Sequence, residues 1–141
     1  MDKAEWKIAW NDGLAVDVPE MDEEHRQFIA RVNEINKAII DAAEKTTVEQ
    51  LMDVMLTEAA RHFQHEQQLL QQWNYPQARA HAERHDQLIA KFKHALKEFQ
   101  KSDLSFVWAL KGLQMKQLLV EHLLREDMKY KAFLKTQKRS R

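Results

Sequence analysis

Two short segments of this sequence each place a pair of metal-binding side chains four residues apart. The first contains His62 and Glu66, and the second contains His81 and His85. On an α-helix, residues i and i+4 lie on the same face, one turn apart. The two side chains of each pair can therefore bind the same metal ion. A short turn between the segments, which Pro76 marks, would make the two pairs face each other across antiparallel helices.

The whole chain favours a helical protein. Only two glycines and two prolines occur in 141 residues. Apolar residues recur with a helical period over about residues 21–43, 47–73, 77–101 and 104–135. Because short connections join these stretches, we predict an all-α fold, an antiparallel up-down-up-down four-helix bundle with an irregular N-terminal arm. We expect one domain over residues 1–141, with the arm at 1–20, the bundle at 21–135 and a basic tail at 136–141.

Local signals refine this prediction. Thr46 and Glu49 have the spacing of a capping box at the start of the second helix. Pro76 suits the first turn of the third helix, where its missing N–H costs nothing. Gly112, inside the fourth helix, indicates a close contact with a neighbouring element. Two tryptophans in the arm predict that the arm packs on the bundle.

Composition excludes several classes of protein. The 22 basic and 22 acidic residues argue against a nucleic-acid binder with a broad basic face. The absence of cysteine excludes a disulfide framework, a thiolate zinc site and an iron–sulfur cluster. No segment has the apolar length of a signal peptide or a membrane span. We therefore expect a cytoplasmic monomer that binds neither nucleic acid nor membrane.

The spacing between histidines predicts that they meet at one level of the bundle. His25 and His62 are 37 positions apart (62 − 25), and His85 and His122 are also 37 apart (122 − 85). In antiparallel helix pairs, equal separations place both pairs at the same height. Only 15 positions separate Glu66 from His81, so this layer lies near the turn at Pro76. The predicted layer contains His25, His62, Glu66, His81, His85 and His122.

Asp127 joins this layer less simply. It follows His122 by five residues, which is about 140° around an ideal helix. Either Asp127 reaches across from the seam between helices, or a π-type turn widens the fourth helix locally. We predict a distortion of the helix between these two residues.

A single histidine on an apolar helix face is usually a satisfied core residue. Five histidines and two carboxylates at one level are different, because burying them without partners would cost roughly 1–3 kcal/mol each. Metal coordination removes that cost. His65 flanks His62 and fits either a supporting contact or the surface, and we expect His94 to be solvated, so we assign neither as a ligand.

Seven nitrogen and oxygen ligands are too many for one zinc ion and suit two ions bridged by carboxylates. Glu66 and Asp127 are the natural bridges. The mixture of imidazole and carboxylate favours iron over manganese or zinc. We expect no Tyr or Cys in the layer to act as a radical or nucleophile. Reversible binding of a small diatomic molecule is therefore favoured over oxidation of a substrate.

Over nearly its whole length the chain resembles the bacterial hemerythrins. The matching pieces are Trp10, Val16-Asp17-Val18, Met21-Asp22-Glu23-Glu24-His25, His62-Phe63 with Glu66, Tyr75-Pro76, His81, His85, His122 and Asp127. The resemblance implies two non-haem iron ions, bridged by Glu66, Asp127 and an oxo or hydroxo group. It also implies that His81, His85 and His122 fill one iron, whereas the iron held by His25 and His62 keeps an open position for O2.

Two positions depart from the family pattern. Gln67 replaces a second glutamate, and Leu118 replaces a tryptophan that often precedes the histidine of the fourth helix. We expect Phe63, Leu118 and Leu119 to line the oxygen pocket.

The sequence is compatible with three functions. The first is an oxygen-binding protein for storage, delivery or buffering, served by an unknown reductase or recipient protein. The second is a di-iron enzyme that acts on peroxide or nitric oxide, or stores iron. The third is a structural or signalling bundle with a vestigial site, against which the complete ligand set argues.

Overall fold

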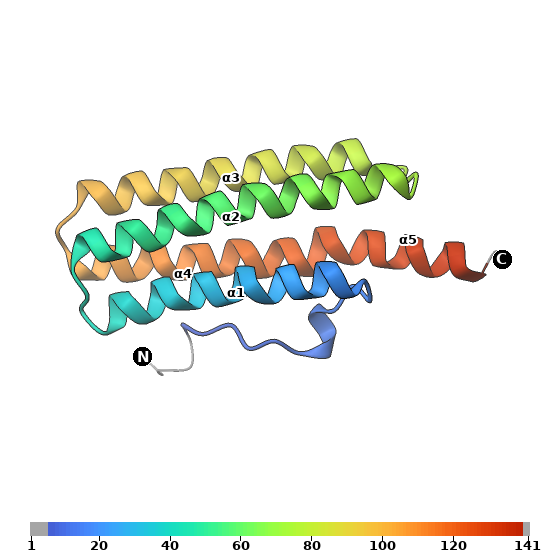
Figure 1. Cartoon of the computed structure of the whole chain (residues 1–141). Helices are drawn as coiled ribbons and strands as arrows, with labels where there is room; N and C mark the ends of the chain where they lie inside the picture. Colours follow the sequence, from blue (N-terminus) through green and yellow to red (C-terminus); the bar gives the residue numbers. More distant parts are fainter. Residues whose placement is uncertain (1–5, 140–141) are drawn as a thin grey trace.

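The structure, a computed structural model, describes the backbone of residues 6–139 and the side chains of residues 6–137. Four helical rods lie side by side and run alternately up and down, joined by short turns (Figure 1). This arrangement confirms the predicted all-α bundle, and the described residues contain no strand. The helices are α1 (Pro19–Ile40), α2 (Lys45–Gln72), α3 (Ala78–Lys101), α4 (Ser105–His122) and α5 (Met128–Arg139). A π-helical turn, η2 (Leu123–Asp127), joins α4 to α5, so these three segments form the fourth rod.

Two predicted helix starts are wrong. α2 begins at Lys45 with Glu44 as the preceding residue, and no side chain caps it, so the capping box at Thr46 does not form. Glu44 has the extended backbone of an N-cap residue, and its carbonyl accepts a hydrogen bond from the N–H of Val48, so Thr46 already lies inside the first turn and cannot cap it. The ammonium group of Lys45 donates hydrogen bonds to the carbonyls of Gln100 and Ser102, which ties this turn to the end of α3. α3 begins at Ala78, so Pro76 lies in the turn before the helix instead of in its first turn.

The turn before α3 is held by the end of α2 and by a buried ring. Asn74 adopts a left-handed φ of 57°, which asparagine tolerates, and the N–H of Tyr75 donates to the carbonyl of Leu70 at 3.0 Å. The ring of Tyr75 packs against Tyr130 and Phe133 of α5. At the other end of the chain, α5 continues to Arg139, so the predicted tail at 136–141 begins as helix.

The N-terminal arm packs on α1, as predicted for its described residues. The backbone of Ile8 forms two hydrogen bonds with the Asn33 side chain, at 2.8 and 2.9 Å. The guanidinium of Arg26 lies 4.5 Å from the ring centre of Trp10. A short helix, η1 (Asp12–Leu14), precedes α1. Residues 1–5 of the predicted arm lie outside the described part.

Gly112 makes the close contact that its position indicated. Its carbonyl accepts a hydrogen bond of 3.1 Å from the side chain of Asn36 on α1. A Cβ at this position would lie 2.0 Å from Asn36 Oδ1, so only glycine allows α4 to approach α1 so closely.

Two apolar clusters occupy different levels of the bundle. The larger fills the half that contains the α1–α2 and α3–α4 turns, and Val48, Met52, Phe92 and Phe99 are fully buried there. The smaller packs around Tyr130 near the α2–α3 turn. The seven predicted ligands lie between these clusters. No helix in the described part of the chain is long and apolar enough to cross a membrane.

Candidate metal site

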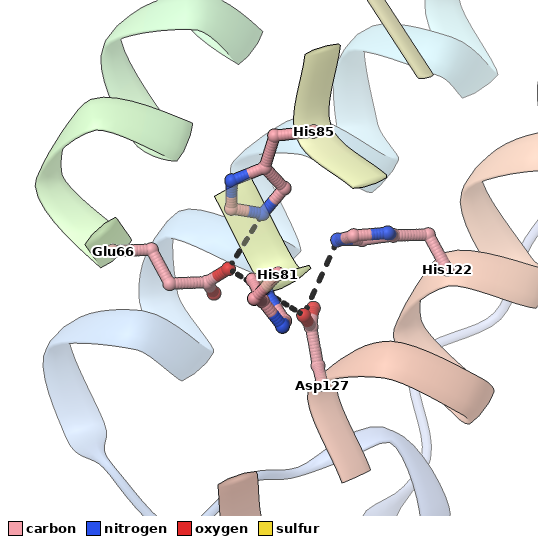
Figure 2. Close-up of side chains that lie close together, drawn as sticks. All are labelled: Glu66, His81, His85, His122 and Asp127. Atoms are coloured by element: carbon pink, nitrogen blue, oxygen red, sulfur yellow. Dashed lines mark hydrogen bonds and ion pairs between the residues drawn. The ribbon is translucent and has the colours of Figure 1, made fainter. Parts of the chain in front are cut away.

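All seven predicted ligand residues are buried and lie in one layer of the bundle. Each helical rod contributes at least one of them, and Figure 2 shows five of the seven. α1 positions His25, α2 positions His62 and Glu66, α3 positions His81 and His85, and the fourth rod positions His122 and Asp127. The equal spacings in the sequence therefore correspond to equal heights in the fold.

Glu66 lies at the centre and directs its two oxygens to opposite sides. Oε1 is 2.9 Å from Nε2 of both His81 and His85. Oε2 is 3.1 Å from His25 Nε2 and 3.6 Å from His62 Nε2. One carboxylate thus faces two sets of imidazoles, with a different oxygen for each.

Asp127 repeats this arrangement from the fourth rod. Its Oδ1 lies 3.1 Å from His81 Nε2 and 3.2 Å from His122 Nε2, whereas Oδ2 lies 3.3 Å from His25 Nε2. The predicted distortion is confirmed, because η2 is a π-helical turn. A wider turn takes more residues per revolution, so the fifth residue after His122 returns to the inner face.

These contacts divide the layer into two groups that share Glu66. One consists of Glu66, His81, His85, His122 and Asp127, and the other of His25, His62 and Glu66. In each group the candidate ligand atoms lie within 4.8 Å of one another. The first group offers three imidazoles and the second only two.

The donor atoms are better placed to bind metal ions than to form hydrogen bonds with one another. Buried side-chain atoms without a hydrogen-bond partner in the described part include His85 Nε2, His122 Nε2 and both oxygens of Asp127. Each such atom costs roughly 1–3 kcal/mol if nothing binds it. Metal bonds of about 2.1 Å at right angles would separate neighbouring donors by about 3.0 Å, close to the distances observed here. The layer can therefore hold cations.

Buried charge perturbs the protonation of these groups. Burial acts to raise the pKa of Glu66, but contacts with His25, His81 and His85 outweigh it and hold this pKa well below its ordinary value. Burial acts to lower the pKa of His81, but its contacts with Asp127 and Glu66 outweigh burial and raise this pKa to about 9. The two carboxylates thus favour positive charge in the layer, whether from protons or from metal ions.

The expectation that no tyrosine reaches the layer is wrong. Tyr130 on α5 is fully buried, and its hydroxyl donates a hydrogen bond of 2.9 Å to Glu66 Oε2. Burial, followed by the charges of Glu66 and Asp127, raises the pKa of this phenol and keeps it a donor. The sequence offered one signal, since Tyr130 follows Asp127 by three residues and shares its helix face.

Two polar side chains, Glu24 and Gln67, contact the outer nitrogens of histidines. Glu24 lies 2.8 Å from His62 Nδ1 and 2.6 Å from His65 Nδ1, with a different oxygen for each. For His65 the sequence left open a supporting contact or a surface position. The structure shows both, because His65 is half-buried and contacts Glu24, the residue that holds His62. On the other side, the carboxamide of Gln67 lies 2.9 Å from His85 Nδ1.

The three residues expected to line an oxygen pocket occupy different places. The ring of Phe63 stacks on His85 with 4.0 Å between centres and also lies 5.5 Å from His62. Leu119 belongs to the large apolar cluster. Leu118 lines a hollow of about 150 Å³ beside His122, between α3 and α4.

A larger cavity, of about 320 Å³, lies beside His62 between α1 and α2. Its wall combines charged groups such as Glu24, Arg31 and His65 with apolar ones such as Phe28 and Ala59. Leu118 is not part of this wall. Among the remaining histidines, His94 is 66% exposed, as expected, and lies 3.8 Å from Glu98 on the same helix.

Comparisons with known proteins agree with this geometry. Residues 16–134 match the model of the family described as hemerythrin HHE cation binding domain. A hemerythrin-like protein of Naegleria gruberi is 26% identical over 125 residues, covering 89% of this chain and 92% of that protein. The corresponding protein of Naegleria fowleri gives the same values.

A bacterial relative also matches, over a shorter part. Bacteriohemerythrin of Stenotrophomonas maltophilia (strain R551-3) is 25% identical over 93 residues, covering 66% of this chain and 60% of that protein. The family match covers most of the chain and includes all seven residues of the layer. The chain therefore belongs to the hemerythrin HHE cation-binding family.

Proposed function

We propose that this protein holds two non-haem iron ions and reversibly binds O2 at one of them. The observation that carries the proposal is the asymmetry of the two ligand groups around the shared carboxylates. His81, His85 and His122 surround one position, whereas only His25 and His62 face the other. The position with fewer protein ligands has room for an exogenous molecule. An all-nitrogen-and-oxygen donor set with five imidazoles suits iron.

The chain's own residues hold this arrangement in place. Glu24 fixes the ring of His62 from outside, so that Nε2 points into the layer. Gln67 does the same for His85, provided its carboxamide turns to present oxygen to a protonated Nδ1, a rotation that preserves its shape. Tyr130 donates to Glu66, and Phe63 shields the histidines from water. When bound, the iron pair would supply the redox chemistry that O2 binding requires.

The test is an anaerobic titration of metal-free protein with Fe(II), followed by exposure to O2. We expect two iron ions per chain and a visible absorption band that forms in O2 and fades when O2 is removed. A band that forms once and never reverses would reject reversible binding.

Two histidine variants make the test specific to the site. His62→Ala should lose the response to O2, because it removes one of the two imidazoles beside the open position. His94→Ala removes an exposed histidine and should change neither the iron content nor the band. A His62→Ala protein with two irons and an unchanged band would remove the ligand assignment.

One observation favours a second candidate, a reaction with peroxide. The cavity beside His62 is larger than a diatomic molecule needs, and its wall contains Glu24, Arg31 and His65. Polar walls of this kind suit a hydrogen-bonding substrate. Steady consumption of peroxide by the iron-loaded protein, abolished in His62→Ala, would favour this function over reversible O2 binding.

A further inference from the structure

Two histidines of the layer have polar side chains at their outer nitrogens, and these partners differ in charge. On the side with two imidazoles, His62 Nδ1 lies 2.8 Å from a carboxylate oxygen of Glu24. On the side with three imidazoles, His85 Nδ1 lies 2.9 Å from the carboxamide of Gln67. The Nε2 atoms of both rings point inward to Glu66, at 3.6 and 2.9 Å. One inward-facing imidazole therefore has an anionic group behind it, and the other has a neutral group.

The charge of such an outer partner changes how strongly an imidazole binds a metal ion. When Nδ1–H donates a hydrogen bond to a carboxylate, the ring gains electron density at Nε2 and becomes a more basic ligand. A carboxamide oxygen carries no net charge, so it orients the ring but adds much less electron density. More basic ligands bind divalent cations more tightly and favour the higher oxidation state of iron. Hydrogen bonds of this kind are one means by which a protein tunes a metal site.

The position of the His85 ring does not depend on Gln67 alone. Phe63, one turn earlier on α2 and on the same face, stacks on this ring with 4.0 Å between centres and 9° between planes. The ring is therefore held by its face as well as at its edge. Glutamate has nearly the same shape as glutamine, and residue 67 is only partly buried, so a carboxylate there would keep some contact with water. The effect of charge at this residue can thus be separated from the effect of ring position.

We propose that Gln67 is a positioning residue that keeps His85 a weaker electron donor than a carboxylate partner would make it. The position with three imidazoles then binds its cation less tightly than it would beside a carboxylate, and it holds iron more readily in the reduced state. Glu24 acts in the opposite direction on the position that His62 faces. This inference rests on the metal binding of the proposed function, but it does not depend on the reversibility of O2 binding.

Titration of the metal-free protein with Co(II), followed by its visible absorption, tests the effect on metal affinity. Gln67→Glu adds charge without changing shape, and we expect it to raise the affinity of the tighter position roughly tenfold. Gln68→Glu adds the same charge at the next residue, which is exposed, and should change each affinity by less than about twofold. An unchanged or lower affinity in Gln67→Glu would overturn the proposal, because a glutamine with a purely structural role gives one of these two results.

The reverse substitution on the other side provides a second, independent variant. Glu24→Gln should lower the affinity of the weaker position roughly tenfold, because it replaces an anionic outer partner by a neutral one. Glu23→Gln removes a charge from the preceding residue, which is exposed, and is the matched control. The double variant Glu24→Gln/Gln67→Glu should separate the two Co(II) affinities further than either substitution alone. Affinities that do not move in Glu24→Gln would show that the charge of the outer partner has no effect, which also overturns the proposal.

The reduction potential of the iron-loaded protein gives a readout that packing alone does not move. Gln67→Glu should shift this potential to more negative values, whereas Gln68→Glu should leave it near the wild-type value. A shift to more positive values, or none, would reject the role of Gln67. Wild-type protein that binds no metal would reject both the proposed function and this inference. Wild-type protein that reacts irreversibly with O2, while the Gln67→Glu shifts occur as expected, would reject only reversible O2 binding.

Discussion

The metal layer and the large apolar cluster are built on the same four helical rods, but the layer buries polar side chains and the cluster buries apolar ones. The cluster around Phe92 and Phe99 contains apolar side chains that need no partner beyond close contact. The layer around Glu66 and Asp127 contains buried nitrogens and oxygens, several without a hydrogen-bond partner in the described part of the chain. The apolar cluster is therefore stable through its own packing, whereas the polar atoms of the layer need bound cations as partners.

This difference has an energetic consequence. Apolar burial contributes about 25 cal/mol per Å² removed from water. Unpartnered buried polar atoms act in the opposite direction, at roughly 1–3 kcal/mol each. Metal binding should therefore stabilise the layer much more than the cluster, and variants in the two regions should respond differently to metal.

The largest effect is expected from the carboxylate that faces both groups. Glu66→Gln keeps the size of the side chain but removes its charge, so the affinity for Co(II) or Fe(II) should fall more than about a hundredfold. Metal titration followed by elemental analysis measures this. Glu58→Gln changes a glutamate that pairs with Arg31 on the outside of the bundle and serves as the control. Unchanged affinity in Glu66→Gln would show that the layer does not depend on the charge of Glu66 to bind metal.

A variant in the apolar cluster should affect stability alone. Phe92→Ala leaves a cavity and should lower the free energy of unfolding by about 3–5 kcal/mol. Urea unfolding should show the same loss with and without bound metal, because Phe92 belongs to the large apolar cluster, where its ring packs against Phe28. Lys93→Ala, an exposed neighbour, should change stability by less than about 0.5 kcal/mol. A loss that appears only without metal would show that the two regions are coupled.

Tyr130→Phe tests a hydrogen bond at the boundary between the regions. It removes the donor to Glu66 and should lower the stability of the metal-free protein by about 1.5–3 kcal/mol. Tyr75→Phe, which also removes a phenol hydroxyl from the smaller cluster, should cost less, since no hydrogen bond to the layer is lost. Thermal unfolding of both variants gives the difference. Equal losses would assign Tyr130 to apolar packing alone.

The smallest effect, counted per pH unit, is a dependence of metal affinity on pH. His81 has its pKa raised to about 9, so a metal ion must displace its proton at neutral pH. Affinity should therefore rise up to about tenfold per pH unit for each proton displaced, and level off above pH 9. Titrations with Co(II) at several pH values measure the slope.

The same pKa values fix the sign of the effect of pH on the metal-free fold. The raised pKa of His81 contributes stability that is fully present below pH 6.5 and is lost as pH rises through 9. The lowered pKa values of Glu66 and Asp127 contribute stability at neutral pH that is lost in acid. Thermal unfolding that shows greater stability of the metal-free protein above pH 9 than at pH 6.5 would contradict this sign.

The sequence by itself determined the four helices and the level at which their histidines meet. Helical period and chain length set both, because an antiparallel pair converts equal spacing into equal height. His25, His62, His85 and His122 illustrate this, since two separations of 37 residues ended in one layer. Helix starts were less predictable, because several neighbouring residues can begin a helix: α2 begins at Lys45, ahead of the capping pattern at Thr46 and Glu49.

Only the tertiary structure decided which side chains of one helix contact those of another. Asp127 reaches the layer through a π-helical turn, and the hydroxyl of Tyr130 donates a hydrogen bond to Glu66. The carboxylate of Glu24 contacts two histidines, His62 and His65. The tertiary structure also left Phe106 and Leu110 of α4 exposed among the described residues. Sequence spacing fixes the height and rotation of a residue on its own helix. The reach of a side chain to its partner depends on how far apart the helices lie and how each is turned, which is settled only when the whole bundle packs.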